Sequence, residues 1–309
     1  MKKGIAVILA AAMLLVVGLL SCGQVTPEEL WSQSQEAIAQ VESVRMDLNL
    51  DMAFTVEEET TAMTMQMREV CTQDPLAAQV ELTMDMGALG EVITEMYLVK
   101  EGETYASYLK LSGGLLEEDE DTQWVRTTVD AAELEQYNAV DNAQLYLEAM
   151  SSFQAAGSQA IGQYDTIRYD GRITGEDISK VLGAMGDNFS DMSGSFVDTD
   201  TMAAMFQGLG GIPMSIWLDK ETALPVRYEM DLADLVEEVM NELIQTLSGL
   251  TAESIPFQVD KAKVLVECRD YNAIAPITVP DAAKGAEDVD DLDDEYEDWE
   301  ETVEDQEVA

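Results

Sequence analysis

The chain has 309 residues, with 62 acidic and 16 basic side chains, no histidine and a formal net charge of −46 at pH 7. This balance excludes nucleic acid as a partner, because binding it requires basic surface that releases counterions. The lack of histidine excludes Ser-His-Asp and Cys-His catalysis and most zinc sites. We therefore expect a protein that is not an enzyme, with no metal and no cofactor.

The amino terminus has the pattern of an export signal. Lys2 and Lys3 precede an apolar run over residues 5–20, which is short for a bilayer span of about 20 apolar residues. The run leads into Leu-Leu-Ser-Cys-Gly at residues 19–23, which resembles the bacterial lipobox, where a small residue precedes the cut and a thiol accepts diacylglycerol. The alternatives are an ordinary secretory signal with an incidental Cys22, or an uncleaved anchor.

We expect residues 1–21 to be a lipoprotein signal peptide and residues 22–26 a lipidated spacer. Cys22 is then the lipidation site, and its acyl chains hold the protein at the extracytoplasmic face of the cell membrane. Two chains make a stable anchor, at about 0.8 kcal/mol for each buried methylene, whereas one chain binds only marginally. The membrane is thus the predicted partner, through Cys22.

A helix is predicted directly after the spacer. Thr26 is a good N-cap, Pro27 suits the first helical position and Glu29 completes a capping box. Leu30, Trp31, Ile38 and Val41 recur on one face to about Glu42, so the helix should pack against other elements.

Alternation with a period of two begins at Val44 and predicts a meander of antiparallel strands. Apolar and polar side chains alternate from Met46 to Val56, and the pattern returns in four later segments before a sixth strand at Trp124–Val129. Turn signals such as Asp74-Pro75 and Glu101-Gly102 separate the strands.

The second half of the chain mixes helices and strands. A helical region is predicted from Asp130 through Phe153, and the strongly amphipathic segment Leu232–Leu247 predicts another helix. The other predicted elements are a strand at 166–173, helices at 175–185 and 202–206, a hairpin of 212–218 with 225–230, and a strand at 262–268.

Two cysteines remain besides Cys22. Cys71 and Cys268 both lie in predicted strands, and in an oxidising compartment such a pair is a candidate disulfide. The alternative is two buried free thiols that act as small apolar residues. Sequence does not supply the Cα separation of about 4.4 to 6.8 Å that a disulfide requires.

The carboxyl end changes in composition. Residues 27–283 carry the predicted elements and form one expected domain, whereas residues 284–309 are dominated by acidic side chains. Such a segment cannot bury enough apolar surface to fold alone, so we expect a disordered tail. It could serve to bind calcium or a basic partner, or simply to keep the protein soluble.

The order of these features resembles one family. The lipobox, the capped helix, the methionine-rich strands, the hairpin Ile216–Val226 and the ending Tyr271–Pro280 together look like the Gram-positive lipoproteins related to LolA, LppX and LprG. The resemblance implies an α+β fold, namely a half-open antiparallel β-barrel with helices packed on its concave side. In the better-known relatives the hollow holds a lipid or acyl chain.

The functional hypothesis is therefore a monomeric, membrane-anchored lipoprotein that binds a lipid or other hydrophobic molecule. Methionine suits such a cavity because its unbranched, polarizable side chain repacks around different ligands. The alternatives are that the same side chains fill a solid core, or that the domain is an envelope interaction or sensing module. The candidate lining residues are Met46, Leu48, Leu50, Met52, Phe54, Met63, Met65, Met67, Leu82, Met84, Val239 and Leu243.

Other chemistry is disfavoured by context. Met63, Met65 and Met67 would suit copper(I), which prefers thioethers, but strand alternation already accounts for their spacing. Ser107 and Lys110 match Ser-x-x-Lys, but on a strand and without the partner motifs of penicillin-binding enzymes.

Overall fold

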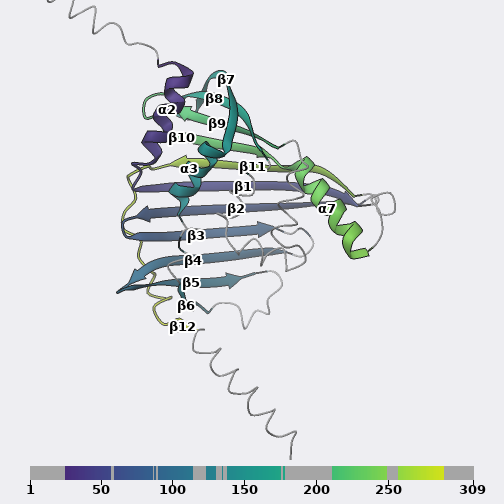
Figure 1. Cartoon of the computed structure of the whole chain (residues 1–309). Helices are drawn as coiled ribbons and strands as arrows, with labels where there is room; N and C mark the ends of the chain where they lie inside the picture. Colours follow the sequence, from purple (N-terminus) through teal and green to yellow (C-terminus); the bar gives the residue numbers. More distant parts are fainter. Residues whose placement is uncertain are drawn as a thin grey trace, which may run out of the picture.

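The computed structural model describes residues 25–56, 59–85, 87, 90–113, 123–129, 134, 138–174, 177, 211–248 and 257–288. Within them, the strands form one twelve-stranded sheet in the order β12-β6-β5-β4-β3-β2-β1-β11-β10-β9-β8-β7 (Figure 1). The strands are β1 (Ser43–Val56), β2 (Glu59–Gln73), β3 (Leu76–Asp85), β4 (Glu91–Glu101), β5 (Thr104–Ser112), β6 (Val125–Val129), β7 (Met150–Ile161), β8 (Tyr164–Ile173), β9 (Ile212–Asp219), β10 (Pro225–Asp231), β11 (Phe257–Arg269) and β12 (Glu287–Asp288).

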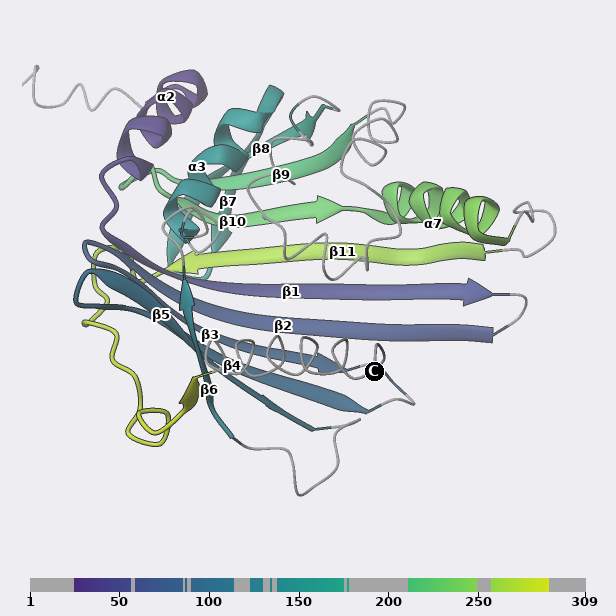
Figure 2. The same ribbon diagram turned by 60° about the horizontal axis from the view of Figure 1, so that its bottom comes forward.

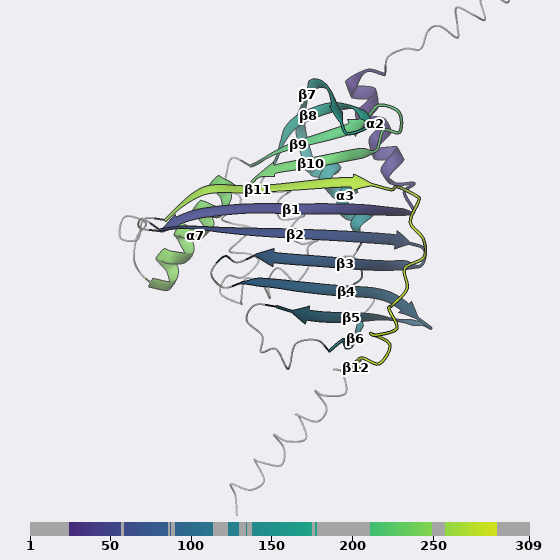
Figure 3. The same ribbon diagram turned by 180° about the vertical axis from the view of Figure 1, so that it is seen from behind.

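All pairings are antiparallel except that of β12 with β6, and the two edge strands β7 and β12 do not pair with each other. The described helices are α2 (Pro27–Ile38), α3 (Ala139–Ala149) and α7 (Ala233–Ser248). All three lie on the same side of the sheet, toward the viewer in Figure 1 and behind the strands in Figure 3. This open sheet with helices on its concave face confirms the predicted α+β, half-open antiparallel barrel.

The start of α2 is the one that the sequence predicts. The backbone N–H of Glu29 donates to the Thr26 hydroxyl at 3.3 Å, and the N–H of Thr26 donates to the Glu29 carboxylate at 3.0 Å. This capping box satisfies two of the N–H groups that a helix start leaves without partners. Leu30, Trp31 and Ile38 then point into the core.

Strand register separates the two faces of the sheet. Met46, Leu48 and Leu50 alternate with Asp47, Asn49 and Asp51 along β1, so the first set faces the helices and the second faces outward. On the outer face Arg68 of β2 forms ion pairs with Asp47 at 3.2 Å and Glu81 at 3.0 Å. The outer face of the central strands is thus polar and charge-paired.

The core lies on the concave face, beneath α2 and α3. Trp31 of α2 stacks on Phe153 of β7 with ring centroids 4.0 Å apart, and Tyr169 of β8 donates its hydroxyl to the Pro27 carbonyl at 2.7 Å. Leu147 of α3 and Ile216 of β9 are almost completely buried in the same cluster. In Figure 2, α3 crosses this end of the sheet while α7 lies alongside β11 at the other end.

Residues 270–288, here called the strap, cross the outer face after β11. The strap is fixed at its start by Asn272. The side-chain oxygen of Asn272 accepts from the Glu42 backbone N–H at 2.7 Å, and the backbone N–H of Asn272 donates to the Ser43 carbonyl at 2.9 Å. It ends in β12, where Asp288 pairs with Arg126 of β6. In Figure 3 it runs along the ends of the strands to the β6 edge.

Two boundaries differ from the sequence expectation. Glu287 and Asp288, which composition assigns to the acidic tail, form the edge strand β12, where Arg126 of β6 pairs with Asp288. The predicted helix through Phe153 ends at Ala149, and Met150–Ile161 is the edge strand β7. Most of β7 is exposed and rich in small or polar side chains, so it lacks the alternation that reveals a half-buried strand.

Cys71 and Cys268, the two cysteines in the described part of the chain, form no disulfide and are both buried. Cys71 of β2 pairs with Val44, and Cys268 of β11 pairs with Met46, so β1 lies between the two. Two strand spacings are about 9.5 Å, beyond the Cα separation of a disulfide. The structure therefore has the second of the two alternatives, thiols that pack as small apolar residues.

Several predicted features lie outside the described residues: the signal peptide, Cys22, the helices at 175–185 and 202–206, and the tail from residue 289. Among the helices that the structure describes, none is both long enough and apolar enough to cross a bilayer.

Candidate ligand-binding face

The candidate site is a continuous apolar area on the concave face, which we call the methionine face. Cross-strand register aligns its side chains in rows: Leu50 lies opposite Met65, which lies opposite Met84. The next rows pair Leu48 with Met67 and Leu82, and Met52 with Met63. The residues of the methionine face are Leu48, Leu50, Met52, Phe54, Met63, Met65, Met67, Leu82 and Met84.

Burial changes along the strands. At the α3 end, Val44, Met46 and Cys71 are 2%, 8% and 0% exposed. Every residue of the methionine face, on the same strands and the same face, is only half-buried. Of the predicted lining residues, Met46 therefore belongs to the solid core and the methionine face lies beyond it.

The helix α7 borders the far end. Phe54 of β1 stacks on Phe257 of β11 with centroids 5.7 Å apart, and Glu237 of α7 accepts from the Val259 N–H at 3.0 Å. Val239 and Leu243 belong to α7, but their side chains lie outside the described part of the structure. Their predicted role in the lining remains a prediction.

One acidic side chain interrupts this apolar surface. Glu69 continues the row of Met63, Met65 and Met67 along β2, and register places it between Met46 of β1 and Val80 of β3. Burial raises the pKa of its carboxyl from 4.5 to about 7. Sequence reasoning missed Glu69, although its position two residues after Met67 would have placed it on the same face.

Tyr146 lies on α3, which packs against β1 and β2, and it is close enough to Glu69 to feel the charge of that carboxylate. Its ring packs edge-on against Tyr228 of β10, with centroids 5.9 Å apart. Burial, followed by the nearby charges of Glu69 and Cys268, raises the pKa of the Tyr146 phenol to about 12. The phenol therefore stays protonated at neutral pH and can donate a hydrogen bond.

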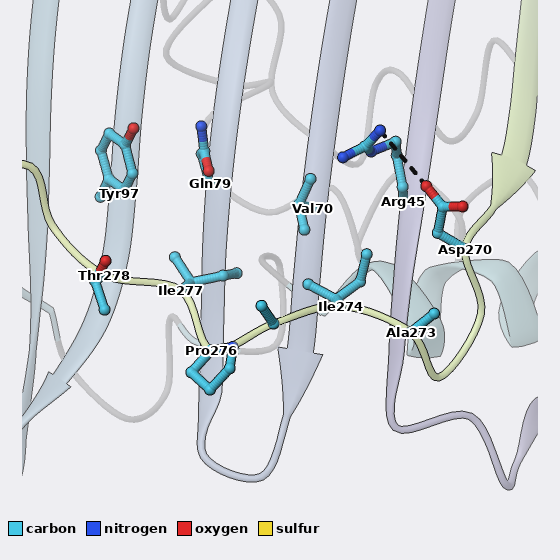
Figure 4. Close-up of a pocket in the computed structure, with 11 residues that line it drawn as sticks. Arg45, Val70, Gln79, Tyr97, Asp270, Ala273, Ile274, Pro276, Ile277 and Thr278 are labelled. Carbon is cyan, nitrogen blue, oxygen red and sulfur yellow. Dashed lines mark ion pairs between the residues drawn. The ribbon is translucent and has the colours of Figure 1, made fainter.

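A second hollow lies on the opposite face, beneath the strap (Figure 4). Its volume is about 380 Å³, and its walls are Arg45, Val70, Gln79 and Tyr97 from the strands and residues 270 and 273–278 from the strap. Arg45 forms an ion pair with Asp270 at 3.5 Å, with 39% of the Arg45 side chain exposed. This pocket is shallow and polar, and it does not join the predicted lining residues.

Residues 26–288 match the model of DUF6612, described as a family of unknown function. The chain belongs to this family. A comparison with curated proteins finds no match.

Solved structures that resemble this DUF6612 protein include LppX, LprF and a LolA superfamily protein, which are of the same kind as the lipoproteins that the sequence resembles. They are the Mycobacterium tuberculosis lipoprotein LppX (15% identity, TM-score 0.40, 82% of this chain and 100% of that one), LprF from Mycobacterium bovis (16%, 0.43, 84% and 100%) and a LolA superfamily protein from Nitrosomonas europaea (9%, 0.21, 83% and 96%).

The DUF6612 chain shows no acidic or cysteine cluster suited to a metal in the part that the structure describes. Met63, Met65 and Met67 share one face of β2 with Leu48 and Leu50 opposite them on β1. The structure thus brings the predicted strand residues together as an apolar surface whose polar feature is the Glu69–Tyr146 pair.

Proposed function

We propose that this protein is an extracytoplasmic lipoprotein, anchored through acylated Cys22, that binds a lipid or another hydrophobic molecule on the methionine face. The observation that carries the proposal is the change in burial along β1 and β2. The inward-facing apolar side chains along these strands are buried beneath α3 and only half-buried beyond it. Large contiguous apolar surface is costly to leave in water, and it marks ligand or partner sites in soluble domains.

The composition of the face suits a ligand of variable shape. Five of its nine residues are methionines and the others are leucine and phenylalanine, so several thioethers can adjust to acyl chains of differing length and branching. Half-burial leaves these side chains room to change rotamer, which a solid core at crystal-like density does not allow.

Lipid extraction tests this function. The mature chain, residues 22–309 with Cys22→Ala, keeps every described element and carries no lipid of its own. We expect mass spectrometry of organic extracts from the purified protein to show a stoichiometric hydrophobic molecule. Clean extracts after expression in several hosts, together with no uptake of added lipid, would contradict the proposal and favour a solid core.

The anchor is tested separately, by metabolic labelling with a palmitate analogue. Label should enter the wild-type protein and be absent from Cys22→Ala, because the thioether forms only on that sulfur. Equal labelling of both proteins would remove Cys22 as the lipidation site while leaving the ligand-binding face untested by that result.

A further inference from the structure

Glu69 occupies an unusual position for a carboxylate in this protein. Its cross-strand partners are Met46 and Val80, and its neighbours on the same face of β2 are Met67 and Cys71. A carboxylate moved from water to such surroundings loses hydration and needs a partner to offset that loss. Asp47 and Glu81, by contrast, lie on the outer face in ion pairs with Arg68.

Glu69 has no such partner within the described residues, where it forms neither a hydrogen bond nor an ion pair. Burial is the cause that raises its pKa, and no positive group lowers it. The Tyr146 hydroxyl also forms no hydrogen bond to another described group. Both side chains are half-buried, so a molecule lying on the methionine face can reach them at the α3 end.

We propose that Glu69 and Tyr146 form a head-group subsite at the α3 end of the methionine face, which takes the hydrogen-bond-donating end, ammonium or hydroxyl, of a long-chain amphiphile. This inference rests on the proposed function, since the chain of the same molecule would lie along Met67 and Met65. A carboxylate accepts hydrogen bonds and a phenol donates or accepts one, so an alcohol is satisfied by both groups. An ammonium gains charge pairing with Glu69 in addition.

A ligand with a carboxylate head is disfavoured at the same place. Two carboxylates in an apolar pocket repel each other, and one must take up a proton. The titratable groups that face Glu69 are Tyr146 from α3, Cys268 from β11 and Cys71 from β2 itself, while β1 and β3 contribute Met46 and Val80. Burial raises the pKa of Cys268 to about 12, and thiols and phenols are neutral or negative at any pH, so none of these neighbours supplies a positive charge.

Calorimetric titration with three probes of one chain length tests the subsite: dodecylammonium and dodecanoate below their critical micelle concentrations, and dodecanol below its solubility limit. The protein is the unacylated mature chain at about pH 8, where Glu69 is ionised. We expect dodecylammonium to bind most tightly, dodecanol next and dodecanoate at least about tenfold more weakly than the amine, which corresponds to about 1.4 kcal/mol.

The variant Glu69→Gln should remove the preference for the amine and restore dodecanoate binding, and Tyr146→Phe should weaken dodecanol binding several-fold. Glu81→Gln is the matched control, because Glu81 lies one residue from Val80 but on the outer face, where it pairs with Arg68. This variant should bind the three probes in the same order of affinity as the wild type. The wild type also gives a test without substitution: lowering the pH below 6 should weaken amine binding as Glu69 takes up a proton.

The failures are distinguishable. Equal affinities for the three probes, unchanged in Glu69→Gln and independent of pH, would overturn the subsite and leave the hydrophobic face intact as a binding site. Preference for dodecanoate would also overturn it. Absence of binding by any probe to the wild type would overturn both the subsite and the proposed function.

Discussion

The two ends of the concave face are built from the same strands by the same alternation, yet they are packed differently. At the α3 end, side chains from α2, α3 and β8–β11 join Val44 and Met46 in a closed cluster. Beyond Met46, the methionines of β1–β3 are half-buried. Alternation therefore tells which way a side chain points, whereas packing partners from distant segments decide whether it is enclosed.

The sharpest test of this difference is to replace one methionine by alanine at each end of the face and to compare the losses of stability. Met214 of β9 is 2% exposed within the core cluster. We expect Met214→Ala to lower the free energy of unfolding by about 2 to 5 kcal/mol, because it leaves a cavity in close-packed surroundings. Urea denaturation measures the change; a loss below about 1 kcal/mol would show that this end is not a solid core.

The pH dependence of stability tests the role of Glu69, which lies at the boundary between the two ends. Because the folded-state pKa of Glu69 is raised to about 7 from 4.5, the wild type keeps its full stability below about pH 4.5 and loses this contribution as the pH rises through 7. Glu69→Gln does not ionise. It should therefore gain up to about 3 kcal/mol over the wild type at pH 8 and differ little at pH 4.

Urea denaturation of both proteins across this range measures the gain, with Glu81→Gln as the control whose effect stays below about 1 kcal/mol. A stability difference between wild type and Glu69→Gln that does not vary with pH would show that Glu69 is solvated in the folded protein.

A smaller effect is expected where the strap begins. Tyr271 donates its hydroxyl to the Pro225 carbonyl at 2.7 Å, and burial raises the pKa of this phenol well above its usual value. Tyr271→Phe should cost about 1 to 2 kcal/mol, because a buried carbonyl loses its partner. Thermal unfolding reports the change, and an unaltered melting temperature would mean that water replaces the hydroxyl.

The smallest effect on stability is expected at the open end. Met65→Ala should lower the free energy of unfolding by less than about 1 kcal/mol, since a half-buried side chain leaves a cavity that solvent can enter. The same variant should weaken dodecylammonium binding several-fold. A cost equal to that of Met214→Ala would erase the distinction between the two ends.

Much of the fold could be predicted from local signals. The capping box at Thr26 and Glu29 sets the start of α2, and alternation from Met46 to Val56 sets both the length and the faces of β1. The sequence does not predict the edge strand β7, because Gln154, Ser158 and their neighbours are exposed on both faces and show no alternation of apolar and polar side chains.

The site was only partly predictable. Met63, Met65 and Met67 were assigned to the inner face from spacing alone, but their degree of burial depends on where α3 and α7 pack, which no local pattern encodes. The sequence does not single out Glu69 as a site residue, because acidic side chains are abundant throughout this chain. Its meaning comes from cross-strand register with Met46 and Val80.

The first and last described residues lie toward opposite edges of the sheet. Val25 lies three residues after Cys22, a reach of about 10 Å, and leads into α2 beside β8–β10, while Asp288 closes the far edge (Figure 1). The eleven spacings of about 4.8 Å between the twelve strands make the sheet about 50 Å wide along its curved surface. With Cys22 as the proposed anchor, the acidic residues that follow Asp288 begin far from the lipid, where the membrane's negative charge is screened because the Debye length is only about 8 Å.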